Sequence, residues 1–549
     1  MDKINNLSIN DLLPVNARPF PKLLWLILVI SFLLNIMAIN WGLPSPSFQG
    51  WSANEITPSS VLSGMETKYS REWSSKYPPL HYYTLSLFYL PVYCIDALNR
   101  TSLSPLTLHT IYFVIGRLLS VFMGTFIVFM VYLCGCEVTD RKTAPFASLI
   151  TAWTPPFLYY SKTANVDIPY LFWFVIALYF FIRILKNHRT SDYILFSGTA
   201  AFSIGTKDQA YGLFILTPFI IIYSLYRRSK VEDSSPNLIP RVFHKKILLA
   251  FVTGTFLFII IYNLLLNFEG IKSHFLLITG PARGERFFPS SASGFLQMLV
   301  QTFKNLEFIL GWPLLFICIL GFVYALTKKK KHPVLLWFAV LIASYYVTFI
   351  CIVGKNLVKH LLPIYILMSF YGALCLSFFL HSSRRFKVMK YLLVIILFAN
   401  SLFYSFSVNV IMMNDSRYYV ENWMKKHIPQ NESILFVGSP NFLPRNKGFP
   451  NVTHRLHPNA RFITETNPSF ILINSEILKS KQPFLYQKLS ENRLDYELVL
   501  KYKSSPWLSL LPEHKIRLEG DTRIITNLDL INPEIMIFQK VKSPTHTGD

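Results

Sequence analysis

The chain has 549 residues, of which 52% are hydrophobic and only 15% are charged, and its formal net charge is +23. A soluble domain carries about 25% charged residues, and the apolar residues here form blocks long enough to cross a bilayer, so a soluble enzyme is excluded. The Lys and Arg residues lie mainly between these blocks. This distribution indicates topogenic charge and membrane-lipid contact, not a nucleic-acid surface.

Eleven apolar blocks are predicted to span the membrane. With the N-terminus in the cytoplasm, the basic clusters near residues 141, 186, 228, 329 and 385 all fall on the inner side, as the positive-inside rule requires. The short loops and Lys-rich inner connections favour the inner membrane of a bacterium. The predicted spans are residues 23–43, 109–135, 144–160, 168–184, 193–206, 209–226, 246–266, 306–326, 333–352, 361–380 and 390–412.

Two further segments complete the predicted organisation. Residues 80–98 are apolar but begin after two prolines and contain a histidine, several tyrosines and an aspartate, so we expect a helix lying along the outer surface. Residues 414–549 contain a helical stretch at 416–427 and short strand patterns at 433–437, 470–474, 496–501 and 534–539. The sequence therefore predicts a mainly α fold: a polytopic transmembrane bundle over residues 1–413, with a large first outside loop at 44–108, and a small α/β extramembrane domain over residues 414–549 outside the membrane.

The first outside loop contains the first candidate site residues. Glu55 follows the first span closely, and Lys76 and Tyr77 come some twenty residues later. A carboxylate here can face headgroups, while the ammonium and the phenol can hold a phosphate. Glu55 is equally well suited to stand at the N-terminus of a helix opened by Thr57 and Pro58, and both interpretations stay open.

Asp167 and Lys207 stand at the outer ends of two later spans. A carboxylate at the mouth of a span marks a functional site or caps the helix, and Pro169 two residues later fits a cap. Lys207 is followed directly by Asp208. The two side chains could neutralise each other, or Lys207 could face an anionic lipid phosphate.

The remaining outside-facing candidates are basic. Arg117 lies near the outer end of the second span, where it could snorkel or bind a headgroup. Arg283 belongs to the fourth outside loop, and Lys355 and His360 to the fifth. Such residues are often solvated flanks of spans, so their role as substrate ligands is a hypothesis.

No nucleotide-binding, zinc-protease or nucleophile-elbow motif occurs in a fitting context. An activated donor must therefore arrive by another route, and a lipid-linked phosphate suits a membrane protein with acidic and basic outside loops. No cofactor is indicated, although a divalent metal would be compatible with phosphate chemistry. The expected partners are a polyprenyl-phosphate sugar donor, an acceptor that is a lipid, a glycan or a protein, and membrane lipids.

Several short motifs occur in an order that resembles the C-type glycosyltransferases, the class of protein O-mannosyltransferases and lipid A aminoarabinose transferases. The resemblance implies a membrane glycosyltransferase that moves a sugar from a polyprenyl-phosphate donor to an acceptor on the extracytoplasmic side. The matching elements are the acidic motif after the first span, residues 77–80, 116–119 and 165–167, Lys207, and residues 360–363.

The acidic motif departs from that family at one position. The family has an Asp–Glu pair after the first span and its Asp is the proposed base, whereas this chain has Asn54 before Glu55. An amide cannot accept a proton as a general base. Either Glu55 or Asp167 takes that role, or the chain is a catalytically silent scaffold of the transferase fold. A transporter or flippase of lipid-linked sugars is the remaining alternative, and it predicts paired repeats that are not visible in the sequence.

Overall fold

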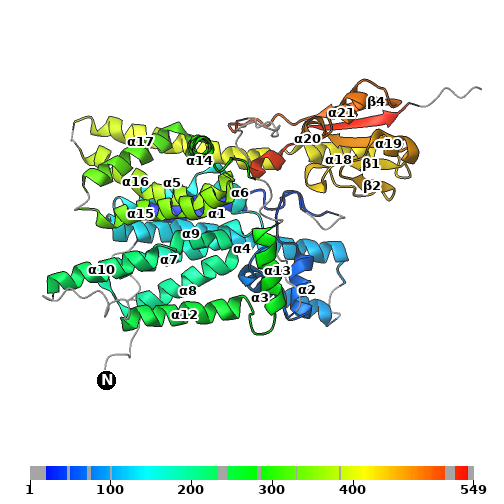
Figure 1. Cartoon of the computed structure of the whole chain (residues 1–549). Helices are drawn as coiled ribbons and strands as arrows, with labels where there is room; N and C mark the ends of the chain where they lie inside the picture. Colours follow the sequence, from blue (N-terminus) through cyan, green and yellow to red (C-terminus); the bar gives the residue numbers. More distant parts are fainter. Residues whose placement is uncertain are drawn as a thin grey trace, which may run out of the picture.

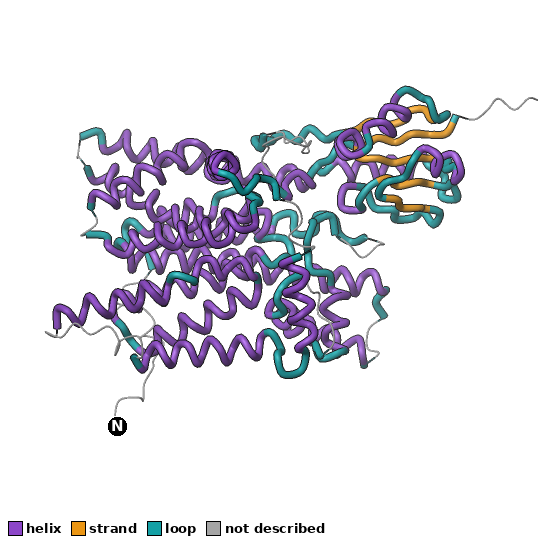
Figure 2. Tube along the Cα trace, in the orientation of Figure 1, coloured by secondary structure: helices purple, strands orange, loops and turns teal. Residues whose placement is uncertain are grey.

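The computed structural model describes residues 20–45, 50–70, 76–98, 102–232, 244–280, 286–328, 331–382, 385–512 and 526–541. A bundle of long helices makes up most of the described chain, and a smaller C-terminal domain lies at one end of it (Figure 1). The strands are confined to that domain (Figure 2). This arrangement confirms the predicted fold class.

Each predicted span coincides with one helix of the bundle or with a consecutive pair. Among the described residues, seven helices are long and apolar enough to cross a membrane. The predicted count of eleven is not confirmed, because four spans correspond to helices shorter than eighteen residues. The bundle consists of α1 (Lys22–Ile36), α4 (Pro105–Val138), α5 (Ala144–Ala152), α6 (Pro155–Tyr160), α7 (Asp167–Asn187), α8 (Thr190–Thr206), α9 (Tyr211–Phe214), α10 (Thr217–Glu232), α12 (Lys245–Ile261), α14 (Ala292–Thr327), α15 (Pro333–Tyr345), α16 (Leu362–His381) and α17 (Lys387–Met413).

Local sequence explains where these helices break. The predicted span 144–160 divides into α5 and α6 because Thr154 precedes Pro155 and takes an extended backbone, as a residue before proline prefers. The loop predicted at 267–305 is largely helical instead. It holds α13 (Phe268–Thr279), and α14 already begins at Ala292 and continues across a kink at Gly311, whose φ is +71°.

The loops predicted to lie outside contain three described helices that do not belong to the bundle: α2 (Pro58–Glu66), α3 (Leu80–Ala97) and α13. Helix α3 begins directly after the two prolines, as expected for residues 80–98. Helix α13 runs across the direction shared by α7, α8 and α12 (Figure 1). These helices lie at the same end of the bundle as the C-terminal domain (Figure 1).

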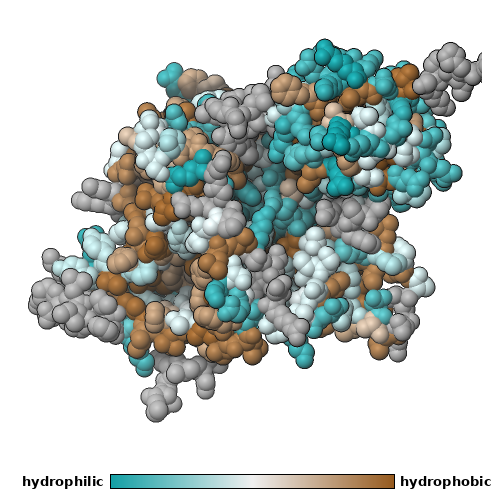
Figure 3. All heavy atoms as spheres, turned by 45° about the vertical axis from the view of Figure 1, so that its right-hand side comes forward, coloured by the Kyte–Doolittle hydropathy of each residue, from teal (hydrophilic) through white to brown (hydrophobic). Residues whose placement is uncertain are grey.

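On the face that Figure 3 shows, hydrophobic side chains cover much of the bundle, whereas the C-terminal domain is largely hydrophilic. Exposed apolar side chains on α12 and α17, such as Phe251 and Ile396, stand outside the packed core. Helix α7 differs, because 78% of its most apolar window is buried inside the bundle. An apolar exterior around a packed apolar core is typical of a multi-pass membrane protein.

The C-terminal domain contains a mixed five-stranded sheet in the order β2-β1-β3-β5-β4. Strand β1 is parallel to β2 and β3, while β5 is antiparallel to β3 and β4. Strands β1 and β3 are buried on both faces, as expected of central strands. The strands are β1 (Ile434–Val437), β2 (Val452–Arg455), which the sequence did not predict, β3 (Phe470–Asn474), β4 (Tyr496–Tyr502) and β5 (Ile535–Lys540), and the helices are α18 (Ser416–His427), α19 (Ala460–Thr466), α20 (Ser475–Lys481) and α21 (Pro483–Ser490).

Candidate functional site

The two candidate carboxylates converge on the loop at residues 161–166, between α6 and α7. Glu55 accepts a hydrogen bond of 2.8 Å from the backbone N–H of Ala164, and the N–H of Ile56 donates to the carbonyl oxygen of Ala164, also at 2.8 Å. Asp167 is the first residue of α7, three positions further on. Residues far apart in the sequence thus meet at one loop.

Glu55 is tied to Arg117 of α4 in a two-pronged ion pair. Arg117 Nε and Nη2 donate to the two oxygens of Glu55, each at 2.8 Å, and both side chains are buried. The second η-nitrogen of Arg117 donates to the backbone oxygens of Ile39 at 2.6 Å and Trp41 at 2.8 Å. The predicted phosphate ligand Arg117 therefore joins the end of α1, the first outside loop and α4, with its donors directed at protein atoms.

Asp167 and Lys207 form a second buried ion pair, with Lys207 Nζ 2.6 Å from Asp167 Oδ1. The Asp167 N–H donates to Asn165 Oδ1 at 2.7 Å, so Asn165 holds the start of the helix. A carboxylate in the first turn is also favoured by the helix dipole. Oδ2 of Asp167 receives no hydrogen bond from the residues that the structure describes, which leaves one oxygen available for chemistry.

Lys207 occupies the turn between α8 and the following helices. Its ammonium lies 5.3 Å from the centre of the Tyr170 ring, and the lysine is 7% exposed. Burial lowers the pKa of Lys207 to about 8, and the attraction of Asp167 opposes that lowering. Lys207 therefore titrates much closer to neutrality than an ordinary lysine does.

Asn54, at the position where the C-type glycosyltransferases that the sequence resembles have an Asp, has a structural role in its loop. Its φ is +63°, a left-handed conformation that asparagine tolerates better than most residues. Its amide oxygen accepts a 2.5 Å hydrogen bond from Lys76 Nζ. Lys76 also feels the charges of Lys359 and Asp167, so the lysine lies beside the Asp167–Lys207 pair while its direct partner is a neutral amide.

Tyr77 and His360 stand close to the same pair. Burial raises the pKa of Tyr77, and the neighbouring charge of Asp167 raises it further, so the phenol keeps its proton and can donate a hydrogen bond. His360 is buried against the ring of Phe349, and it lies near enough to feel the charge of Lys207.

Of the last two predicted ligands, Lys355 and Arg283, the structure describes only Lys355. The Lys355 ammonium lies 5.4 Å from the centre of the Phe287 ring. The backbone oxygen of Lys355 also accepts a hydrogen bond from Nδ1 of His360 at 3.4 Å. Arg283 lies outside the described residues.

Sequence reasoning missed the partners of a half-buried carboxylate beside this site. Asp208 does not pair with its neighbour Lys207: its Oδ1 lies 3.1 Å from Nε2 of His274 on α13 and accepts a 3.3 Å hydrogen bond from the Tyr262 hydroxyl. Gln209 donates to the hydroxyl of Tyr170 at 2.7 Å. The acidic and amide residues after Lys207 were the available signal, but nothing in the sequence indicated that α13 would reach them.

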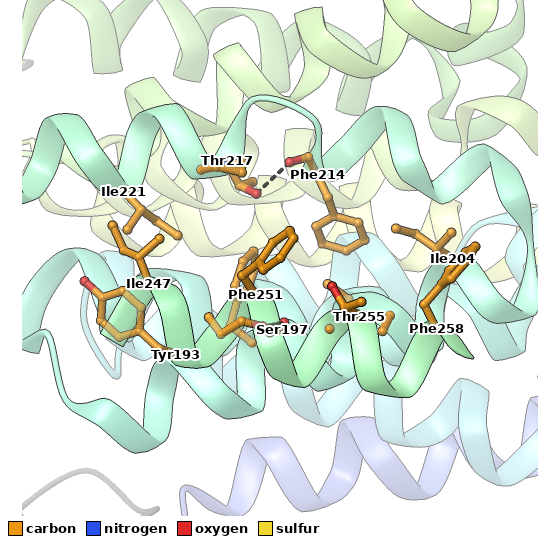
Figure 4. A pocket seen from close by; sticks show the side chains of 16 residues that line it. Tyr193, Ser197, Ile204, Phe214, Thr217, Ile221, Ile247, Phe251, Thr255 and Phe258 are labelled. Carbon is orange, nitrogen blue, oxygen red and sulfur yellow. Dashed lines mark hydrogen bonds between the residues drawn. The ribbon is translucent and has the colours of Figure 1, made fainter. Parts of the chain in front are cut away.

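An apolar groove of about 510 Å³ opens between α8, α10 and α12 (Figure 4). Ile204 and Phe258 line one end, and Tyr193 and Ile247 line the other. Ile204 stands three residues before Lys207, and the Phe258 ring packs 4.4 Å from that of Tyr262, which binds Asp208. One end of the groove therefore adjoins the polar turn.

In the part of the chain that the structure describes, no group of three or more His, Cys, Asp or Glu side chains could hold a metal ion. The polar groups of the site are instead ammonium, phenol and carboxylate groups, which suit an anion and a proton transfer.

One family model matches part of the chain. Residues 112–252 match the model of the dolichyl-phosphate-mannose-protein mannosyltransferases, which confirms the resemblance to C-type glycosyltransferases for this part of the chain. No curated protein matches.

Similar solved structures include ArnT from Cupriavidus metallidurans bound to undecaprenyl phosphate, with 10% identity, a TM-score of 0.45, and coverage of 93% of this chain and 97% of that one. The oligosaccharyltransferase AglB from Archaeoglobus fulgidus, in complex with an inhibitory peptide and a dolichol-phosphate, shows 14% identity, a TM-score of 0.42, and coverage of 92% and 77%. The Pmt1-Pmt2 complex of S. cerevisiae bound to its sugar donor shows 12% identity, a TM-score of 0.33, and coverage of 46% and 34%.

Proposed function

We propose that this chain is a membrane glycosyltransferase that moves a sugar from a polyprenyl-phosphate donor to a hydroxyl or amine acceptor on the extracytoplasmic side. The observation that carries the proposal is the buried Asp167–Lys207 pair, which places an ammonium next to a carboxylate with one oxygen available. A phosphate-linked donor needs a cation at the leaving group and a base at the acceptor. The pair supplies both within one site.

Asp167 is the proposed base. The proton of the acceptor passes to Asp167 Oδ2 as the acceptor oxygen or nitrogen bonds to the anomeric carbon from the face opposite the phosphate. The bond between that carbon and the phosphate oxygen breaks, and its electron pair stays on the lipid phosphate. Lys207 and Lys76 stabilise the charge that the phosphate gains, and the anomeric configuration is inverted.

Glu55 is assigned a different role from the base that the sequence suggested as one option. Its two oxygens already accept three hydrogen bonds, two from Arg117 and one from Ala164. These bonds make Glu55 a positioning residue for the loop that leads to Asp167. With Asp167 as the base, the enzyme needs no carboxylate at position 54. The side-chain oxygen of Asn54 instead accepts a hydrogen bond from Lys76 and holds that lysine in place.

The apolar chain of the donor is proposed to lie in the groove between α8, α10 and α12. A donor phosphate at Lys207 would place the first isoprene units beside Ile204 and Phe258, where the groove begins. The groove lining is almost entirely apolar, so it can accept a hydrocarbon chain without leaving polar groups unpaired.

Transfer of a radiolabelled sugar from a synthetic polyprenyl phosphate, with purified protein in detergent or nanodiscs, tests the proposal. We expect label in an acceptor and release of free polyprenyl phosphate, both dependent on Asp167. A transporter would move the labelled lipid across a vesicle without breaking the sugar–phosphate bond. A silent scaffold would bind the donor and leave it intact, so either result would reject the transferase.

A further inference from the structure

The C-terminal domain contacts segment 50–55, which contains Asn54 and Glu55, and holds it in place. At its start stands Trp51, which is 2% exposed. The guanidinium of Arg417 lies 3.9 Å from the centre of the Trp51 ring, and that of Arg445 lies 5.0 Å from it. Both distances fall within the range of a cation–π interaction.

The domain also donates hydrogen bonds to backbone oxygens of the first loop. The side-chain amide of Asn441 donates to the carbonyl oxygens of Gly50 at 2.9 Å and Ser52 at 3.4 Å. Arg445 donates to the carbonyl oxygen of Pro44 at 3.0 Å. These contacts fix the path of the chain on both sides of Trp51, so the domain holds the segment by backbone and by side chain.

Acidic residues of the C-terminal domain orient the two arginines that contact Trp51. Arg417 is bound by Asp415, whose Oδ2 also accepts a 2.9 Å hydrogen bond from Trp41 Nε1. Arg445 is bound by both oxygens of Glu421. Each arginine is thus neutralised and oriented before it meets the tryptophan, which removes the cost of burying an unpaired charge.

From Trp51 the contacts lead into the candidate site. The hydroxyl of Ser52 hydrogen-bonds that of Tyr159 on α6 at 3.1 Å. Asn54 and Glu55 then make their contacts with Lys76, Arg117 and Ala164. A displacement of Trp51 would therefore be passed along a few residues of chain to the loop that begins the Asp167 helix.

We propose that the C-terminal domain is a positioning part of the active site, acting through Arg417, Asn441 and Arg445 on segment 50–55. The expected effect on turnover rests on the proposed transferase function. The statement that the domain fixes the segment is independent of any activity. Displacing reacting groups by about 1 Å can cost about a hundredfold in rate, so a loose segment should lower turnover more than donor binding.

The test uses the full-length protein with Trp51→Leu on the loop side and Asn441→Ala on the domain side. We expect Trp51→Leu to lower kcat about 10- to 100-fold, with the donor KM changed less than about threefold because Lys207 is untouched. Trp51→Phe retains an aromatic face and should recover most of the rate. Arg461→Ala removes an exposed arginine of the same domain and should leave kcat unchanged.

Hydrogen exchange of the peptide covering residues 50–57 supplies the readout that needs no turnover. Exchange should be faster in Trp51→Leu and Asn441→Ala, while peptides of α4 exchange as in the parent. Unchanged exchange in both variants overturns the inference, and so does faster exchange with unchanged kcat. If the parent transfers no sugar, the proposed function fails alone, and the exchange rates still decide whether the domain fixes this segment.

Discussion

At the scale of single residues, pairing decides which carboxylate can react. The side chains of Glu55 and Asp167 are both buried beside a cation. Both carboxylate oxygens of Glu55 accept hydrogen bonds from protein donors, whereas only one oxygen of Asp167 does. A buried charge left without a partner is costly. Glu55 is thus suited to hold structure, and Asp167 to take up a proton.

Asp167→Asn tests the proposed base. The amide keeps the shape of the side chain but cannot take the acceptor proton, so kcat should fall by about two to four decades. Because the change also leaves the buried ammonium of Lys207 without its carboxylate, we expect some loss of stability as well, and kcat is therefore measured at a temperature at which thermal unfolding shows the variant to be folded. Glu137→Gln is the matched control, because Glu137 pairs with Lys186 on a partly exposed surface. Sugar transfer at the parent rate in Asp167→Asn would remove Asp167 from the mechanism.

Glu55→Gln should act mainly on stability. It leaves the buried guanidinium of Arg117 without its carboxylate, and breaking a buried pair in this way costs about 3–5 kcal/mol. Chemical or thermal unfolding in detergent measures the loss. The double variant Glu55→Met with Arg117→Met removes both charges and should recover part of it, whereas a loss equal to that of Glu55→Gln would contradict the ion-pair explanation.

Lys207 makes donor binding depend on pH. Its pKa is lowered to about 8 by burial, against the pull of Asp167, so in the folded protein it loses its proton as the pH rises through 8, where an ordinary lysine stays charged. The donor KM should therefore rise above pH 8. Lys207→Arg, which remains protonated, should extend tight binding to higher pH, and identical pH profiles of donor KM in the two proteins would count against a phosphate at Lys207.

At the scale of elements, positions of helices could be predicted better than their partners. Long apolar blocks placed the helices of the bundle, and the prolines at 78–79 placed the start of α3. Helix α13 could not be predicted from hydropathy, because a short helix outside the bundle leaves no long apolar signal. The kink of α14 could not be predicted either, because it is a change of backbone direction within one apolar stretch. Strand β2 was missed for a similar reason: its residues are mostly exposed at a sheet edge.

Side-chain pairing was harder still to predict. The sequence suggests Glu55 as a base or a helix N-terminal acid and Arg117 as a headgroup ligand, without linking the two, and 62 positions separate them in the chain. Lys207 was considered beside its neighbour Asp208, whereas its carboxylate partner lies 40 positions away. Such pairs arise from helix packing, which local sequence does not encode.

The groove between α8, α10 and α12 gives a prediction at this scale. Thr255 is an exposed residue that lines the groove (Figure 4), and Thr255→Trp would fill much of it. The KM for a long-chain donor should rise about tenfold, the equivalent of about 1.4 kcal/mol of lost apolar contact. A donor with one or two isoprene units should be little affected.

The matched control for the groove is Val252→Trp on the same helix. Val252 is 54% exposed and does not line the groove, so a bulky side chain there should leave both donors unaffected. An equal rise in KM for the long and short donors in Thr255→Trp would show that the groove does not hold the lipid chain.

At the scale of the whole molecule, orientation decides whether the site can meet its substrates. The C-terminal domain and the polar loops around Asp167 lie at the same end of the bundle, as the contacts of Trp51 and Glu55 show. The Lys-rich connection at 328–331 follows α14. By the positive-inside rule we expect that connection to be cytoplasmic, and we therefore propose that the site and the domain lie outside.

Cysteine labelling tests this orientation directly. In a variant that lacks the six native cysteines, Lys501→Cys on β4 should react with an impermeant maleimide in intact cells, because its side chain is 53% exposed and the domain lies outside. Lys328→Cys, also exposed, should react only after the membrane is opened. The reverse pattern would put Asp167, Lys207 and the C-terminal domain in the cytoplasm, where no extracytoplasmic acceptor could reach them, and the proposed reaction would fail with the topology.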